Sequence, residues 1–173
     1  DAIADNLHQR LANINDLLNS WREKGIQFPH ADSIRPIELL EWETNLPEIE
    51  ASIHIHMTAL ERWNQITALW QDEANSGAQY AGVLEDSEQF IDHVDHLDQR
   101  WKQYELEAMM IIERYENRGI VMGDWSEEIL RDPRSALQQL KNNEQRFKSR
   151  LRCIDELLSI DPSFEGQEEV MSR

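Results

Sequence analysis

Apolar residues recur along this chain at alternating steps of three and four positions, which is the spacing of one face of an α-helix. The first run of this kind ends at Gly25, and Pro29 cannot continue a helix. Its apolar positions are Leu7, Leu11, Ile14, Leu18 and Trp21. The pattern predicts a first helix from about residue 2 to residue 24.

A second, longer run begins at Ser33 or Ile34, with Pro36 in the first turn, where its missing N–H costs little. Pro47 lies inside this run but off its apolar face. We therefore expect one long helix that is kinked or briefly broken near Asn45. Its apolar face comprises Leu39, Trp42, Leu46, Ile49, Ile53, His56, Leu60, Trp63, Thr67 and Trp70.

Two further runs follow. The third is expected to begin near Ser87 and to end at Gly119, and the fourth follows a short helical turn and Pro133. The apolar face of the third run comprises Phe90, Val94, Leu97, Trp101, Tyr104, Ala108, Ile111 and Tyr115. That of the fourth comprises Leu137, Leu140, Phe147, Leu151, Ile154 and Leu158, and Glu144 interrupts it.

The runs follow a seven-residue rhythm, and no segment alternates apolar and polar residues as a half-buried strand would. Long helices with short connections pack as antiparallel neighbours. The sequence therefore predicts an all-α fold, an antiparallel three-helix bundle with an additional C-terminal helix. The predicted parts are the bundle over 1–118, a linker with a short helical turn over 119–133, a fourth helix over 134–160 and a disordered tail over 161–173.

The formal net charge of −17 narrows the classes of partner. Such a surface repels nucleic-acid phosphates and anionic lipid headgroups, so we expect no nucleic-acid partner and no direct membrane contact. The single cysteine, Cys153, excludes an intrachain disulfide, which fits a reducing cytosol. The chain begins at Asp1 rather than Met, so we expect a part of a longer protein or a processed chain.

Two segments resemble the signatures of a known family. LNSWREK at residues 18–24, centred on Trp21, resembles helix A of a spectrin repeat, and LDQRWKQY at residues 97–104, with Trp101, resembles helix C. His56 falls mid-way along the second helix, where such repeats often carry a histidine. The resemblance covers roughly residues 1–118 and implies a core signature of Trp21, His56 and Trp101.

The resemblance also implies a class of function, because spectrin-repeat proteins such as spectrin, dystrophin, plakin and nesprin-like proteins are cytoskeletal spacers and docking platforms. The fourth segment departs from the family pattern, since helix C usually continues unbroken into the next repeat, whereas Gly119, Gly123 and Pro133 interrupt it here. That segment is either the start of another repeat or an extra helix that packs on the first three.

The sequence contains no pattern typical of a catalytic, cofactor or metal site. It has neither a Gly-rich phosphate loop nor a nucleophile elbow, and its acids spread over the outer faces of the predicted helices. His93 and His96 lie three apart, but without the Glu-x-x-His pairs of helical di-iron bundles. We therefore expect no catalytic residue, no cofactor and no bound metal.

The candidate partner-binding residues lie in two Trp-acidic patches and are Leu40, Glu41, Trp42, Glu43, Asp124 and Trp125. The first patch resembles the short Trp-acidic motifs that bind kinesin light chains, and the second resembles them loosely. Such motifs bind when they are extended and exposed. Trp42 has a competing interpretation, which we favour, as a buried core residue, whereas Trp125 lies in a loop and is the more accessible of the two.

Our leading hypothesis is a non-enzymatic structural scaffold, spacer and docking module of a larger cytoskeletal or nuclear-envelope linker protein. The alternative is a motor- or cargo-adaptor module that binds a specific protein through a Trp-acidic patch. Either way, the expected partners are cytoskeletal, motor or adaptor proteins in the cytoplasm, including the cytoplasmic face of the nuclear envelope. We expect the fourth helix to pack along the first three in a monomer; the rival is a dimer through residues 134–160.

Overall fold

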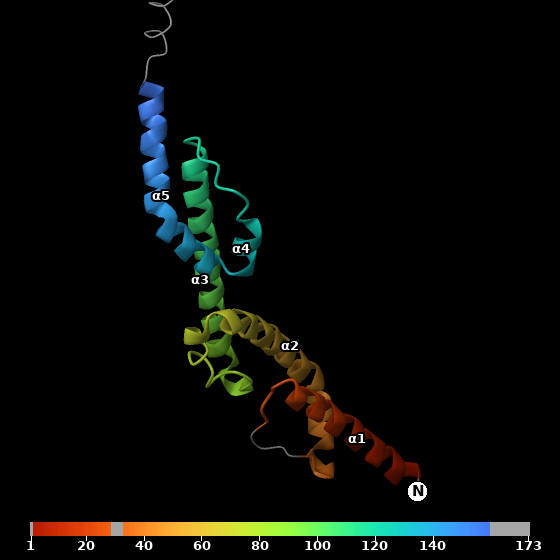
Figure 1. Cartoon of the computed structure of the whole chain (residues 1–173). Helices are drawn as coiled ribbons and strands as arrows, with labels where there is room; N and C mark the ends of the chain where they lie inside the picture. The colour runs from red at the N-terminus through yellow and green to blue at the C-terminus, as the bar shows by residue number, and fades with distance from the viewer. Residues whose placement is uncertain (1, 29–32, 160–173) are drawn as a thin grey trace, which may run out of the picture. The chain divides into compact units, whose positions relative to one another are not determined.

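The computed structural model describes residues 2–28 and 33–159, and every regular element in this part is helical (Figure 1). The elements are α1 (Ala2–Glu23), the 3₁₀ helix η1 (Pro36–Glu38), α2 (Leu39–Leu69), η2 (Gln71–Glu73), η3 (Leu84–Asp86), α3 (Ser87–Glu116), α4 (Ser126–Arg131) and α5 (Pro133–Ser159). The prediction of an all-α protein is confirmed. The predicted tail over 161–173 lies outside the described residues.

The chain divides into two compact units, residues 1–98 and 99–173, and the boundary falls inside α3. The sequence predicts one bundle over residues 1–118 instead. The difference arises because different partners cover the two parts of the apolar face of α3. Phe90 and Val94 pack in the first unit, whereas the buried residues from Ala108 onward pack in the second.

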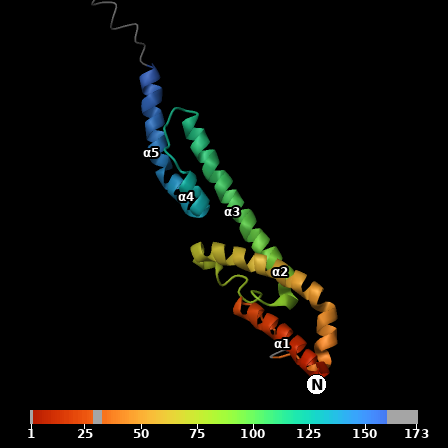
Figure 2. The same cartoon turned by 90° about the vertical axis from the view of Figure 1, so that its right-hand side faces the viewer.

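In the first unit, α1 and α2 run in the same direction rather than antiparallel. Arg10 in the first half of α1 pairs with Glu43 near the start of α2, while Gly25, just after α1, lies against Leu60 farther along α2. The contacting positions thus rise together, and Figures 1 and 2 show the same course. The antiparallel prediction assumed a short connection, but the 15 residues 24–38 are enough to lead the chain back.

α2 and the first part of α3 also run in the same direction. The imidazole of His56 lies 2.9 Å from the hydroxyl of Ser87, and farther along both helices the Arg62 guanidinium donates to the Asp98 carboxylate at 2.7 Å. Here the connection 70–86 returns the chain. An antiparallel three-helix arrangement of this part is therefore wrong, since both connections reverse the chain before the next helix begins.

Two hydrophobic clusters hold the first unit together at different parts of α2. The cluster with α1 contains the buried residues Ile14, Leu18, Trp21, Ile26, Ile34, Leu39 and Ile53, and the cluster with α3 contains Ala59, Phe90 and Val94. α2 stays helical from Leu39 to Leu69, although Pro47 lies inside it. Figure 2 shows that the helix bends along its length, and the expected break near Asn45 is absent.

His56 is the buried polar side chain that joins these elements. Its Nε2 accepts a hydrogen bond from the backbone N–H of Gly82 at 3.0 Å. A backbone amide can only donate, so Nε2 carries no proton, and the proton on Nδ1 is donated to the Ser87 hydroxyl. The ring also stacks on Phe90, with centroids 4.9 Å apart. One imidazole therefore fixes α2 to the start of α3 and to the connection before it.

Gly82 extends this link to the loop that follows α1. Its carbonyl accepts a hydrogen bond from the backbone N–H of Gln27 at 2.8 Å, and its φ of +80° lies in the left-handed region. A Cβ at this position would lie 2.1 Å from the carbonyl oxygen of Gly25. Both the φ angle and the close approach require glycine here.

In the second unit, α5 folds back beside α3 and also runs in the direction of α3. Lys141 pairs with Glu107 at 3.2 Å, and Asp155 near the end of α5 pairs with Arg118 just after α3 at 3.4 Å. The shared core contains Ala108, Ile111, Tyr115, Ile120, Ile129, Ala136, Leu137, Leu140 and Leu151. The fourth helix thus folds back, with α3 and α4 as its packing partners in this unit. The expected packing along the first three helices is confirmed for α3 alone and stays a prediction for α1 and α2.

Stability should depend on pH through His56. Burial lowers the pKa of its imidazole below the ordinary value of about 6.5, because desolvation disfavours the charged ring. The unfolded chain therefore takes up this proton at a pH where the folded chain does not. The contribution of His56 to the free energy of unfolding is fully present above about pH 6.5, and it declines as the pH falls through 6.5 toward the lower folded-state pKa.

We expect the stability difference between the wild type and His56→Gln to shrink as the pH falls from about 7 to about 5 in urea unfolding experiments. A His54→Gln variant is the matched control, because it removes an exposed imidazole two residues away. This control should keep the wild-type pH dependence. A wild-type advantage over His56→Gln that stays constant across this range would contradict the lowered pKa of the buried imidazole.

Candidate protein-docking groove

The connection between α3 and α5 builds the candidate site. α3 ends at Glu116, and Gly119, shortly after it, has a φ of +85°. The backbone N–H of Ile120 donates to the carbonyl of Tyr115 at 3.1 Å. Ile120 is buried, which anchors the beginning of the connection. At the other end, the Asp132 carboxylate accepts a hydrogen bond from the backbone N–H of Ser135 at 3.2 Å, a favourable start for α5.

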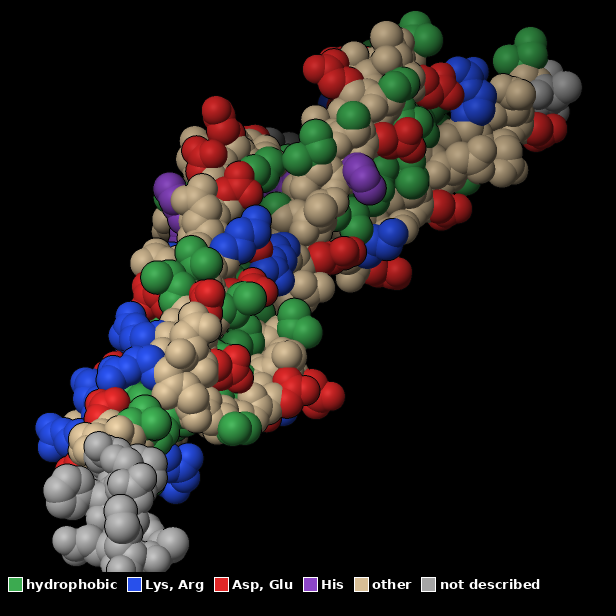
Figure 3. Space-filling view, turned by 90° about the horizontal axis from the view of Figure 1, so that it is seen from above, with side chains coloured by type: hydrophobic (Ala, Val, Ile, Leu, Met, Phe, Trp, Pro, Cys, Tyr) green, Lys and Arg blue, Asp and Glu red, His purple; other side chains and the backbone are tan. Residues whose placement is uncertain are grey.

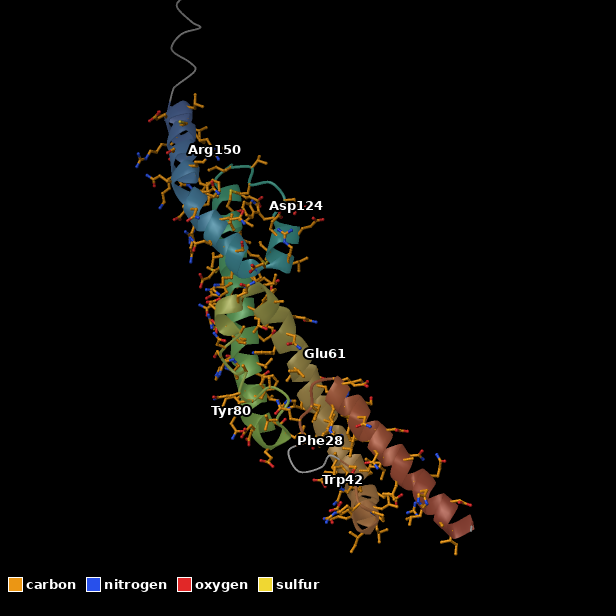
Figure 4. All side chains as sticks on the ribbon, turned by 60° about the horizontal axis from the view of Figure 1, so that its bottom comes forward. Phe28, Trp42, Glu61, Tyr80, Asp124 and Arg150 are labelled. Carbon is orange, nitrogen blue, oxygen red and sulfur yellow. The ribbon has the colours of Figure 1, made fainter. Side chains whose placement is uncertain are left out.

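Trp125 lies within this connection, directly before α4, and is half-buried. Its indole N–H donates to the carbonyl of Met122 at 3.0 Å, and its ring packs against the core of the second unit. The neighbouring Asp124 is exposed (Figure 4), and its carboxylate accepts a hydrogen bond from the backbone N–H of Ser126 at 2.9 Å. This bond lowers the pKa of Asp124 and so favours its charged form.

A groove of about 640 Å³ opens between α3 and this connection. Its apolar lining is Met109, Ile112, Trp125, Ile129 and Leu130, and its acidic lining is Glu105, Glu113, Glu116 and Asp124. Met109 is 54% exposed and Leu130 is 70% exposed, so part of the apolar lining faces solvent. The volume lies within the range of about 300–1,000 Å³ that is usual for binding sites.

The acids along the groove are not neutralised by their neighbours. Lys141 of α5 pairs with Glu107, which does not line the groove. By contrast, Glu105, Glu113 and Glu116 form no ion pair with any residue that the structure describes. A row of unpaired carboxylates beside low-dielectric apolar walls concentrates negative potential over the groove.

Charge is distributed unevenly along the sequence. Residues 1–98 contain 19 Asp and Glu against 5 Lys and Arg, whereas α5 contains 6 Lys and Arg against 3 Asp and Glu. On the face drawn in Figure 3, Lys and Arg side chains gather next to the grey residues, where α5 ends. α5 therefore does not share the acidity of the groove.

The first Trp-acidic patch is largely used by the fold. Trp42 is half-buried and packs against the cluster between α1 and α2, as favoured by the core interpretation. Glu43 forms an ion pair with Arg10 of α1. Leu40 and Glu41 are exposed, but both lie in a helix rather than in an extended segment.

The residues proposed as a core signature do not lie in one core. Trp21 is buried between α1 and α2, where its ring lies 6.1 Å from that of Phe28, and His56 is fully buried. Trp101 is only half-buried, belongs to the second unit and lies outside the three buried clusters. The expectation that Trp21 and Trp101 share one core is therefore wrong, because the division inside α3 assigns them to different units.

Sequence reasoning identified Asp124 and Trp125 but missed the side of the groove that α3 provides. The missed residues include Met109, Ile112, Glu113 and Glu116, which lie three or four positions apart on one side of α3. Ile112 also packs partly against the core, whereas the other three are exposed. The available signal was the pair of apolar positions Met109 and Ile112, which are not on the predicted apolar face of that run. A second, narrower apolar face on a helix indicates a second surface to cover.

Two properties of the described part bear on other kinds of site. Among these residues, no group of three or more His, Cys, Asp or Glu side chains is placed so that it could hold a metal ion. None of the helices that the structure describes is both long enough and apolar enough to cross a lipid bilayer.

No protein-family model, no curated protein and no solved structure matches this chain. The function of the groove is therefore argued from the residues that form it.

Substitutions at two neighbouring residues of α4 should distinguish the groove from the core beneath it. Ile129 is 5% exposed, so Ile129→Ala should lower the free energy of unfolding by about 2–5 kcal/mol. Leu130 is exposed in the groove, so Leu130→Ala should change it by no more than about 0.5 kcal/mol. Urea unfolding followed by circular dichroism measures both variants. An equal loss for both would show that Leu130 belongs to the core and that the groove is not open.

Proposed function

We propose that this chain is a non-catalytic helical scaffold whose groove around Trp125 binds a segment of a partner protein. The observation that carries the proposal is the exposure of Met109 and Leu130 in a groove whose rim is acidic. Large apolar side chains gathered in such a concave place mark interaction surfaces. α3 and the bonded turn at Trp125 form one wall each, so little ordering is needed when a partner binds.

For the role of the whole chain, we retain a spacer and docking module of a larger cytoskeletal or nuclear-envelope linker protein. The resemblance of residues 18–24 and 97–104 to spectrin repeats supports this class, as do four helices of 22 or more residues that can hold distance. The proposed partners are cytoskeletal, motor or adaptor proteins. The covered apolar face of α5 favours a monomer over a dimer through residues 134–160.

The geometry favours Trp125 as part of a receptor rather than as an inserted ligand. A Trp-acidic motif that enters a partner must offer a free, extended indole. The indole of Trp125 is bonded to Met122 and packed on the core, and Trp42 lies inside α2. We therefore place the adaptor alternative second.

Selection from a displayed library of random peptides tests the proposed docking. The purified chain should select peptides whose binding weakens by at least about tenfold in a Leu130→Asp variant, because a charge in the groove opposes burial of an apolar side chain. Leu157→Asp is the matched control, since Leu157 on α5 is 68% exposed and lies outside the groove. Fluorescence anisotropy of labelled peptides measures the affinities.

Peptides that tolerate Leu130→Asp, or that lose affinity equally in both variants, would contradict docking at this groove. Circular dichroism on both variants checks that the fold is retained, which the exposure of both leucines leads us to expect.

A further inference from the structure

We infer that the segment bound by this groove is basic and carries a large apolar side chain flanked on both sides by Lys or Arg. This inference rests on the proposed docking function and adds the chemistry of the partner. It follows from the order of apolar and acidic groups along the groove, from the absence of Lys and Arg from its described lining and from the charge on the facing wall.

The wall formed by α3 has an apolar centre between acidic ends. Glu105 and Glu116 lie 11 residues apart, which is about 16 Å along a helix, and Met109 and Ile112 lie between them on the same side. A segment that places an apolar side chain at the centre therefore has carboxylates within reach on both sides. Cations at both flanks are the complementary arrangement.

The facing wall adds a further negative charge. Asp124 is exposed beside Trp125, and the N–H of Ser126 holds its carboxylate in place. The indole of Trp125 offers an apolar and aromatic surface next to that carboxylate. Arg and Lys side chains suit such a position, because their apolar stems can lie on the ring while the charge meets the acid.

No Lys or Arg lines this groove in the part of the chain that the structure describes. Lys141 and Lys148 of α5 pair with Glu107 and Glu144, neither of which lines the groove. A neutral or acidic partner would remove water from the rim carboxylates without replacing it by a favourable interaction, which opposes binding. A basic partner supplies that interaction and is also steered toward the groove over a longer range.

Three matched synthetic peptides test this inference. Each carries the same central Leu–Leu pair at helical spacing, and the flanking positions are Lys in the first peptide, Gln in the second and Glu in the third. The Lys peptide should bind at least about tenfold more tightly than the Gln peptide, and the Glu peptide should bind most weakly. Fluorescence anisotropy on the full chain gives the three dissociation constants.

Reversing the charge of two groove acids tests whether the preference for Lys flanks arises at the groove. The double variant Glu113→Lys/Glu116→Lys should reduce or abolish the preference for Lys over Gln flanks. The matched control is Glu61→Lys/Glu156→Lys, which changes the net charge equally at two exposed acids that do not line the groove; Glu61 is labelled in Figure 4. The control should keep the preference, apart from a small general weakening.

The outcomes separate the inference from the docking proposal. Lys preference that is lost only in the groove variant supports both. Equal binding of the three peptides, still weakened by Leu130→Asp, leaves docking intact and overturns the charge inference. If the control variant reduces the Lys preference as much as the groove variant does, the peptide is attracted by the net charge of the chain alone, and the charge inference is also overturned. Absence of binding by all three overturns the inference, while the selected library peptides decide the docking proposal separately.

Discussion

The apolar face of α3 has to be covered along 30 residues, and no single helix covers it. α2 packs against its first part, and α4 and α5 pack against its later part. This one constraint explains why the boundary between the two units falls inside a continuous helix. It also explains the candidate site, because the chain must travel back along α3 before α5 can begin, and the groove forms where that return lies beside α3.

The connections between the helices determine the direction in which neighbouring helices run. Three of them, residues 24–38, 70–86 and 117–132, have 15, 17 and 16 residues, and the helices that they join run in the same direction. The first and third begin alike, with the N–H of the isoleucine after the glycine returning to an aromatic residue five positions earlier, at 3.0 Å and 3.1 Å. The second is held by His56 through Gly82, and the third forms the acidic groove.

Much of the fold could be predicted from the sequence, because the spacing of apolar residues reports which face of each helix is buried. Leu18, Leu97 and Leu140 are examples that the structure buries. The direction of packing could not be predicted in this way, since spacing does not distinguish a neighbour that runs parallel from one that runs antiparallel. The length of the connections does indicate this direction, because 15 to 17 residues exceed what a helical hairpin needs. At the site, Trp125 could be identified because it lies in a segment that interrupts the helical pattern. Glu113 could not be identified from the sequence, because its place in the groove depends on the connection that lies opposite it.

The central claim is that the groove between α3 and the Trp125 turn binds a protein segment. Backbone amide chemical shifts, followed by NMR while a peptide selected against the chain is titrated in, test it most directly. The account predicts that the largest shifts lie in residues 105–116 and 123–130, which hold the groove lining. Shifts centred instead on the first Trp-acidic patch in α2, or on the basic part of α5, would contradict it.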